Sequence, residues 1–457
     1  MASPKRSWSL SLMPPEIIQE IFYKTPAEAL VRAKPTCKEW YALLTDASFI
    51  NEHFQRSKEH FIRIFDTVKI MDPVTATSSV SPIPNELLQH PYTIHNLVYT
   101  RMVHCDGLML VGYRGWKYRS DGSRISNLAL WNPVLKNLRW VEPPVETITS
   151  TDYFGIGYNS DGYKIVRFTT RPFEVECCED VPEVEIYEFK TSSWRTIGGE
   201  VDTDVEITSN SVAVMGNMYW TAYRVETPEE EFIRVFDFSD ETFKDICFSP
   251  TSYVNSHLSC FNGDNLSLLQ QDQASRNIEV WVSSKLGDGD VTFSKYFSLS
   301  RPDLPALRVR DDARPVYCFV KPKSVIVWCV EVEGKGTDKA CTCCTLYEIG
   351  EDGVKSKRET ERSYVRDYSR AFRCGYVYVP SMIPLPWMLL NMTRLLIDPP
   401  FVPNTVPQAE GLGKAKTPIL SEAFGKTKTP ALSEGLDDDV PVLAVKALVA
   451  TRITEVK

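Results

Sequence analysis

The sequence predicts an α+β multidomain chain in which a small all-α module precedes a large all-β domain. Two observations predict this division. Apolar residues recur at helical spacing over residues 9–55, whereas short β-branched and aromatic runs alternate with turns rich in Gly, Asp, Asn and Pro over residues 92–380. We expect residues 56–91 to connect the two parts and residues 381–457 to form a Pro-rich, mostly disordered tail.

The all-α module is predicted to contain three helices and a last turn. Pro14 and Pro15 stand at a helix start, where proline loses no needed N–H group. Thr25 and Glu28 have the spacing of a capping box for a second helix, and Pro35 opens a third. Helices this short are marginal alone, so they must pack on each other or on a partner. A plain helical subdomain docked on the rest of the chain stays an alternative.

The third helix and the last turn carry much of the module's apolar surface. We expect a cluster on the third helix that consists of Cys37, Trp40, Tyr41 and Leu44. Asp46 is a suitable N-cap for the turn that follows, because its short carboxylate can accept a hydrogen bond from a free backbone N–H group.

In order and spacing, this module resembles the F-box. The matching residues are Leu12-x-Pro14, Ile17-Ile18-x-x-Ile21, Leu30, Cys37-Lys38-x-Trp40, Leu44, Asp46 and Phe49. The sequence departs from the family pattern at Met13, which separates the usually adjacent Leu and Pro, and at Thr36, where Val is usual. The resemblance implies that the module binds a Skp-type adaptor and, through it, a cullin–RING ubiquitin ligase.

The resemblance also divides the apolar residues of the module into two expected roles. Residues expected to contact the adaptor are Leu12, Pro14, Ile17, Ile21, Leu30, Val31 and Pro35. Residues expected to hold the module together are Cys37, Trp40, Leu44 and Phe49. A module with more apolar surface than it can bury is typical of a partner interface, and packing inside the module stays open for each residue.

The all-β domain contains a weak internal repeat. Its expected strands are residues 103–113, 127–131, 138–141, 154–158, 164–168, 183–189, 194–197, 212–214, 218–223, 233–238, 266–269, 278–282 and 324–330. Five segments share a strand that ends near an aromatic residue, namely Trp131, Tyr187, Phe236, Trp281 and Tyr347. These aromatics lie 56, 49, 45 and 66 residues apart. A period of about 50 residues with about four strands per unit is typical of kelch-like β-propeller blades, and the blade number stays open between about five and seven.

The same domain resembles the F-box-associated domain of plant F-box proteins. The resemblance is carried by Leu130-Trp131-Asn132-Pro133, Phe154-Gly155-Ile156-Gly157-Tyr158, Asp161-Gly162-Tyr163 and Gly216-Asn217-Met218-Tyr219-Trp220, among other runs. It implies a domain that holds an unknown protein target. The two resemblances together imply the substrate-recognition subunit of an SCF-type (Skp–cullin–F-box) ubiquitin ligase. The alternative is a β-propeller ligand-binding or protein-interaction protein that acts outside a cullin ligase.

Composition narrows the partners and the compartment. The net charge is −9, and residues 174–245 hold 19 Asp or Glu against 5 Lys or Arg, which disfavours nucleic acid and suits a basic partner surface. Solvated loops between strands explain the same acidity equally well. The longest apolar run, residues 382–401, is broken by prolines, Arg394 and Asp398. We therefore expect no membrane span and a soluble intracellular protein of the cytoplasm, the nucleus or both.

Catalysis, cofactors and metals are not expected. The chain lacks a G-x-S-x-G elbow, a phosphate loop and an H-E-x-x-H helix. His104, Cys105 and Asp106 adjoin on one strand, where neighbours point to opposite faces of a sheet. The twelve cysteines fit reduced thiols, and Cys341-Thr342-Cys343-Cys344 has no second pair nearby to complete a zinc site.

The tail carries a tandem repeat. GKAKTPILSEA from Gly413 recurs as GKTKTPALSEG from Gly425, in a composition that cannot form a packed core. Thr417 and Thr429 precede prolines and would suit proline-directed phosphorylation, although an unmodified linker is the simpler interpretation.

Overall fold

The computed structural model describes residues 13–386 apart from 65–66, 85–97, 119–123, 145–151, 170–182, 199–201, 203, 229, 249–255, 288, 302, 308–313, 334–340 and 364–374. The side chains of residues 98–101, 113–118, 124–127, 209–210 and 363 also lie outside the described part. The chain divides into two units, residues 1–388 and 389–457, and the second contains no described residue. The predictions for the tail therefore lie outside the described residues, as does Leu12.

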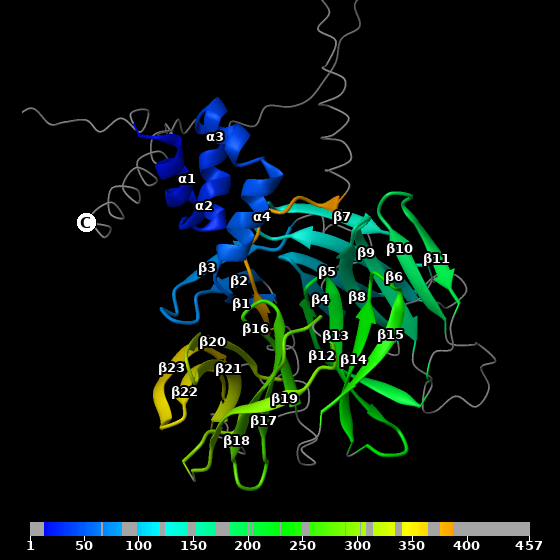
Figure 1. The fold of residues 1–457 in the computed structure, drawn as a ribbon, viewed down its shortest axis with the longest axis vertical. Helices are drawn as coiled ribbons and strands as arrows, with labels where there is room; N and C mark the ends of the chain where they lie inside the picture. The colour runs from blue at the N-terminus through cyan, green and yellow to red at the C-terminus, as the bar shows by residue number, and fades with distance from the viewer. Residues whose placement is uncertain are drawn as a thin grey trace, which may run out of the picture. The chain divides into compact units, whose positions relative to one another are not determined.

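Four short α-helices and one 3-10 turn form an N-terminal helical block (Figure 1). They are α1 (Pro15–Tyr23), α2 (Ala27–Ala33), the 3-10 turn η2 (Lys34–Thr36), α3 (Lys38–Leu43) and α4 (Ala47–Arg56). The predicted last turn is thus a helix of its own, α4. Within the described part of the chain, no helix is long and apolar enough to cross a lipid bilayer.

The two predicted helix caps differ in outcome. The Asp46 carboxylate accepts a hydrogen bond from the Phe49 N–H at 2.9 Å, so its prediction as the N-cap of α4 is confirmed. The predicted capping box at Thr25 is wrong. Pro26 occupies the N-cap of α2, and the Thr25 hydroxyl instead donates to the Ile21 carbonyl at 2.8 Å. This hydroxyl therefore stabilises the end of α1 rather than the start of α2.

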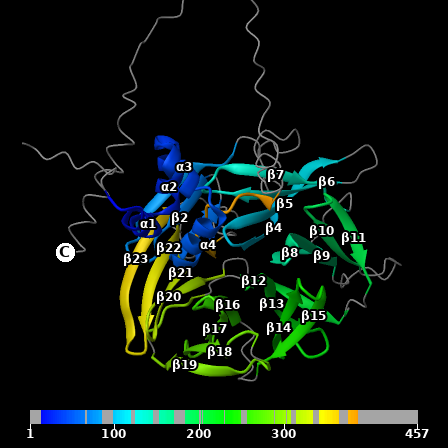
Figure 2. The same ribbon diagram turned by 45° about the horizontal axis from the view of Figure 1, so that its top comes forward.

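Six four-stranded antiparallel sheets form the blades of a β-propeller (Figure 2). From the inner to the outer strand, blades 1 to 6 are β24-β1-β2-β3 (Gly375–Tyr378, His60–Ile64, Thr67–Met71, Ser78–Pro82), β4-β5-β6-β7 (Val98–Cys105, Leu108–Tyr118, Arg124–Asn132, Asn137–Val141), β8-β9-β10-β11 (Asp152–Asn159, Gly162–Thr169, Val184–Glu188, Ser193–Ile197), β12-β13-β14-β15 (Val205–Val214, Asn217–Arg224, Glu231–Asp237, Thr242–Cys247), β16-β17-β18-β19 (Ser256–Phe261, Asn265–Gln271, Ile278–Ser283, Phe293–Leu299) and β20-β21-β22-β23 (Val316–Lys321, Ser324–Glu333, Cys341–Gly350, Gly353–Ser363). The blade number lies within the predicted range.

The predicted repeat corresponds to the third strand of each blade. Its aromatics lie on β6, β10, β14, β18 and β22, the third strands of blades 2 to 6. In blade 1 the third strand, β2, ends at Met71 instead of an aromatic residue, although Met71 is equally buried. The repeat is therefore real in blade 1 too, but its sequence marker is missing there.

Blade 1 corrects the predicted domain boundary. The prediction that residues 56–91 only connect two domains, and that the propeller starts at residue 92, is wrong. Strands β1 to β3 come from this segment, and β1 pairs with β24 from the other end of the domain, with His60 opposite Tyr378. Backbone hydrogen bonds between the two ends of the domain thus close the ring, which removes two exposed strand edges.

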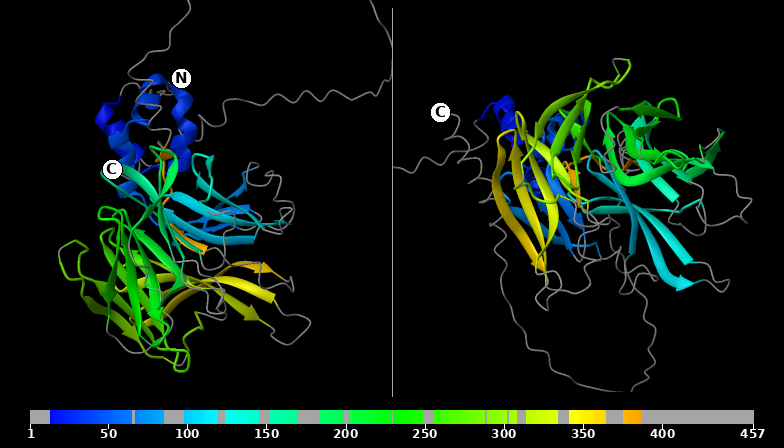
Figure 3. Two further views of the ribbon diagram at one scale, coloured as in Figure 1. Left: turned by 90° about the vertical axis from the view of Figure 1, so that its right-hand side faces the viewer. Right: turned by 90° about the horizontal axis from the view of Figure 1, so that it is seen from below.

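Strand direction places the connections at two edges of the propeller. Because neighbouring strands in a blade are antiparallel, the first-to-second and third-to-fourth turns share one edge, here called the turn edge. The second-to-third and blade-to-blade connections share the opposite edge, here called the loop edge. The helical block adjoins β1 at the turn edge, where β1 starts and β24 ends (Figure 3).

Two glycines of β8 allow blades 3 and 4 to pack closely. The Tyr158 N–H donates to the Gly216 carbonyl at 2.9 Å, and a Cβ atom at Gly157 would overlap that same carbonyl oxygen. A Cβ atom at Gly155 would lie 2.9 Å from the ring of Trp220. The Gly-x-Gly pattern in this strand is therefore a packing requirement of the inner ring.

Candidate functional site

Two aromatic contacts form the centre of the helical block. Phe22 of α1 meets Trp40 of α3 edge-to-face, with 4.9 Å between the ring centroids. Tyr23 of α1 stacks on Phe49 of α4, also at 4.9 Å. Phe22 and Phe49 are both fully buried, so these pairs connect three of the four helices through their core.

The predicted core residues of the block are placed unevenly. Leu44 and Phe49 are buried, whereas Trp40 and Cys37 are half-buried. Cys37 is the N-cap of α3, where its Sγ accepts a hydrogen bond from the Trp40 N–H at 3.4 Å. Tyr41, which the sequence groups with them, is 55% exposed. Successive helical residues point about 100° apart, so a residue next to the inward-facing Trp40 is turned away from the core.

The predicted adaptor-contact residues do not all reach the surface. Those that are exposed or half-buried are Pro14, Ile17, Ile21, Val31 and Pro35. Leu30 is only 1% exposed and packs in the same hydrophobic cluster as Phe22 and Phe49. The expectation that Leu30 contacts a partner is therefore wrong, because its side chain is already part of the core of the block.

The remaining candidates and Tyr41 make up an exposed apolar set. Pro14, Ile17 and Ile21 follow one side of α1 at the spacing i, i+3 and i+7, and Ile17 is 50% exposed. The Lys34 ammonium group lies 5.1 Å from the centroid of the Tyr41 ring. The exposed apolar set is defined as Pro14, Ile17, Ile21, Val31, Pro35 and Tyr41.

The segment after β24 ties the helical block to blade 2. The side-chain amide of Asn132, at the end of β6, donates to the carbonyls of Ser381 and Ile383 at 3.1 and 2.8 Å. Leu385 is buried in the same hydrophobic cluster as Phe49. These contacts fix the block at the turn edge, on the opposite side of the sheets from the loop edge.

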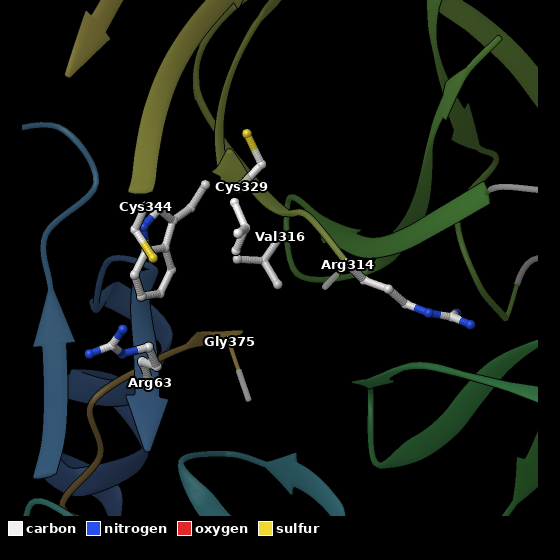
Figure 4. Close-up of a pocket in the computed structure, with 8 residues that line it drawn as sticks. Arg63, Arg314, Val316, Cys329, Cys344 and Gly375 are labelled. Atoms are coloured by element: carbon white, nitrogen blue, oxygen red, sulfur yellow. The ribbon is translucent and has the colours of Figure 1, made fainter. Parts of the chain in front are cut away.

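A small hollow of about 290 Å³ lies where blade 6 meets blade 1 (Figure 4). Arg63, Trp328 and Cys344 are among the residues that line it. The Arg63 guanidinium lies 2.6 Å from a carboxylate oxygen of Glu361, and Arg314 points away from the other labelled side chains (Figure 4). Burial raises the pKa of the Cys344 thiol to about 12. The hollow therefore offers no thiolate nucleophile near neutral pH.

The run from His104 to Asp106 is buried and packs between blades. Burial lowers the pKa of His104 to about 4 and raises the pKa of Cys105 well above its ordinary value. Asp106 accepts a hydrogen bond from the Tyr163 hydroxyl at 2.8 Å, and burial raises its pKa as well. The His104 ring lies edge-on to Tyr376 at 6.2 Å. The imidazole and the thiol are therefore uncharged at neutral pH and serve packing.

Both parts of the chain match known protein families. The F-box domain matches residues 10–51, and the F-box associated beta propeller domain matches residues 58–385. The second match begins just before β1, in agreement with a propeller that includes blade 1. The kelch-like character of the blades stays a prediction.

Similar proteins are found in Arabidopsis thaliana. F-box protein At3g08750 is 43% identical over 387 residues, which cover 82% of this chain and 98% of that protein. F-box/WD-40 repeat-containing protein 1 is 37% identical over 388 residues, covering 82% of this chain and 90% of that protein. Protein SUPPRESSOR OF NIM1 1 is 31% identical over 404 residues, covering 82% and 98%. The similarity thus extends over both the helical block and the propeller.

Proposed function

Because this chain belongs to the F-box proteins that carry an F-box-associated β-propeller, we propose that it is the substrate-recognition subunit of an SCF-type ubiquitin ligase. The helical block binds a Skp-type adaptor, which links it to a cullin–RING assembly, and the propeller binds the target protein. The chain itself supplies no catalytic group. It promotes ubiquitin transfer by holding the target near the transferring enzyme, inside the cell in the cytoplasm, the nucleus or both.

The exposed apolar set is the observation that carries adaptor binding. Ile17 and Tyr41 are 50% and 55% exposed on a block whose other large apolar side chains are mostly covered. Apolar and aromatic side chains held on a rigid surface are typical of the centre of a protein–protein interface. The proposed contact residues are therefore the exposed apolar set, in which Tyr41 replaces the buried Leu30.

The loop edge is the proposed site of target binding. The helical block lies at the turn edge, so an adaptor bound to it leaves the loop edge accessible. Described acidic residues at the loop edge of blades 3 and 4 are Glu183, Asp202, Asp204, Glu206, Glu226 and Glu230. Some of this charge is paired, as between Asp202 and Arg224 at 3.1 Å. The surplus suits a target segment rich in Lys and Arg.

The alternative is a β-propeller ligand-binding or protein-interaction protein that acts outside a cullin ligase. In that case the helical block is a structural appendage, and its packing against the segment around Leu385 is its whole role. The two hypotheses differ in what the exposed apolar set does. Only the first requires it to bind another protein.

Adaptor binding by the full chain tests the proposal. We expect a purified Skp-type adaptor to bind the wild-type protein and to lose at least about tenfold in affinity with Ile17→Asp, because a carboxylate would be buried without a partner. Ile17 is half exposed in the free chain, so this substitution spares the fold. Binding is measured by interferometry with the full-length protein.

Val80→Asp is the matched control. Val80 is 61% exposed on β3 of blade 1, so the substitution makes the same chemical change outside the helical block. We expect it to leave adaptor affinity unchanged. Wild-type protein that fails to bind the adaptor, or a folded Ile17→Asp variant that binds like wild type, would contradict the proposed interface.

A further inference from the structure

Three side chains with metal-binding atoms converge at the loop edge of blade 6. Glu333 ends β21 directly opposite Cys341 at the start of β22, and Cys343 lies two residues further along on the same face. One donor atom from each residue lies within 4.8 Å of the other two. Both thiols are buried, whereas Glu333 reaches solvent. We propose that these three residues bind a thiophilic divalent cation of the Zn²⁺ class.

The separations of the donor atoms suit a tetrahedral ion. Thiolate sulfur binds Zn²⁺ at about 2.3 Å, so two such ligands at a tetrahedral angle lie about 3.8 Å apart. The Sγ atoms of Cys341 and Cys343 are 3.9 Å apart. A sulfur and a carboxylate oxygen on the same ion lie about 3.6 Å apart, and Cys341 Sγ is 3.9 Å from Glu333 Oε2. Only small side-chain movements would bring all three onto one ion.

Glu333 is the carboxylate that remains available to such an ion. Its neighbour on the same face of β21, Glu331, lies opposite Cys343 but already accepts hydrogen bonds from the Thr345 hydroxyl at 2.9 Å and is 3.0 Å from the Lys357 ammonium group. Three protein ligands leave the fourth position of a tetrahedral ion to water or to another ligand.

Arg362 supplies the charge that the filled site needs. Two thiolates and one carboxylate around a divalent cation carry a net charge of −1. The Arg362 Nη1 group already donates to Glu333 at 2.9 Å and to Cys341 Sγ at 3.1 Å, and Glu359 holds the guanidinium from its other side at 2.7 Å. N–H donors of this kind beside metal-bound thiolates orient the ligands and offset their charge.

Binding exchanges protons for the ion. Each thiol loses its proton to solvent as its sulfur bonds the cation, so two protons leave for each ion bound and no electrons are transferred. Burial and the neighbouring Cys341 raise the pKa of the Cys343 thiol to about 12, so the empty site keeps its protons at neutral pH. Proton release is therefore a second readout of binding through these thiols.

The sequence pattern does not reveal this site. Cys341-Thr342-Cys343 has no second cysteine pair nearby, and the third ligand comes from the preceding strand through sheet register. The expectation of no metal, which rested on spacing along the chain, therefore did not consider a carboxylate from across the strand pair.

Titration of the reduced full-length chain with Cd²⁺ tests the proposal. Cd²⁺ bound by thiolates produces an ultraviolet charge-transfer absorption, and calorimetry in two buffers measures the protons released. We expect one tight site per chain that weakens at least about 100-fold in Cys343→Ser. Cys344→Ser is the matched control, because Cys344 is equally buried on the same strand but packs with Trp328 on the opposite face. We expect this control to bind like wild type.

Glu333→Gln keeps the test valid if a buried cysteine substitution unfolds the blade. The Glu333 side chain is 50% exposed, so the fold tolerates this change, and we expect binding at least about tenfold weaker. No thiolate absorption in the wild type, or equal Cd²⁺ affinity in wild type, Cys343→Ser and Glu333→Gln, would indicate an adventitious ion only and overturn the proposal. Adaptor binding plays no part in these measurements, so the result is independent of the proposed function.

Discussion

The helical block and the propeller bury their apolar side chains in different ways. The propeller closes on itself through the pairing of β24 with β1, so every blade packs against neighbours within the domain. The helical block has helices of only six to ten residues, and its core continues into the cluster around Leu385. It nevertheless leaves Ile17 and Tyr41 half exposed. The closed region is thus complete alone, whereas the block keeps an apolar surface for another molecule.

The largest expected effect is on the core of the helical block. Phe49→Ala removes a buried ring that stacks on Tyr23 and should destabilise the block by about 3–5 kcal/mol. Because its short helices depend on this core, we expect amide hydrogen exchange to become fast over residues 15–56. Exchange in the blades should change little, since backbone pairing around the ring holds them.

Phe236→Ala in blade 4 is the control for this difference. Phe236 is equally buried and lies on β14, within the closed ring. We expect a similar cost, but spread over blade 4 and its neighbours, with the helical block still protected. If either substitution loosened both regions to the same extent, the two would be one cooperative unit and the comparison would fail.

The second prediction concerns acid, and it acts on the propeller. His104 is fully buried, and burial lowers its pKa from 6.5 to about 4. The unfolded chain therefore takes up this proton at a higher pH than the folded chain does, so stability is lost as the pH falls from about 6.5 to 4. Each pKa unit corresponds to about 1.4 kcal/mol, which makes the loss about 3 kcal/mol.

Denaturant unfolding at several pH values measures this loss. We expect His104→Gln to lower stability at pH 7 but to flatten the decline between pH 6.5 and 4 relative to wild type. The difference between the two pH curves isolates His104, because other groups titrate in both proteins. Parallel curves would mean that His104 does not stay neutral in the fold.

Sequence periodicity identified strands best where a blade has a conserved place for an aromatic anchor. Trp131 marks β6, but Met71 fills the same place in blade 1, so blade 1 was missed. Residues 103–113 were predicted as one strand because their apolar run is nearly continuous. The structure instead turns at Asp106 and Gly107, both with positive φ. A turn this short leaves little signal in a hydrophobic pattern.

Other features depend on contacts that no local pattern contains. The pairing of His60 with Tyr378 follows from ring closure, and the approach of Glu333 to Cys341 follows from register. In the helical block, the sequence located the helices but did not orient them. Helices α2 and α3 make fewer than two turns, so the periodicity could not show that Leu30 points inward and Tyr41 outward.

A third prediction tests how tightly the ring of blades is packed. Gly157→Ala adds a Cβ atom that would overlap the Gly216 carbonyl of the next blade, so β8 and β12 must separate. We expect a cost of roughly 1–3 kcal/mol in thermal or denaturant unfolding. Gly198→Ala is the control, because a Cβ atom there would have no neighbour within 4 Å. Equal stability of the two variants would mean that blades 3 and 4 can move apart freely.

The smallest expected effect separates two helix caps within the block. Asp46→Ala removes the hydrogen bond to the Phe49 N–H and should cost about 1 kcal/mol. Thr25→Ala should cost less, because Pro26 is the N-cap of α2 and the Thr25 hydroxyl only donates to the Ile21 carbonyl. Both residues precede helices of the same block, so hydrogen exchange over residues 15–56 compares them directly. A larger cost for Thr25→Ala would restore the capping box that its sequence predicts, and with it a helix α2 that depends on its own start rather than on the core around Leu30.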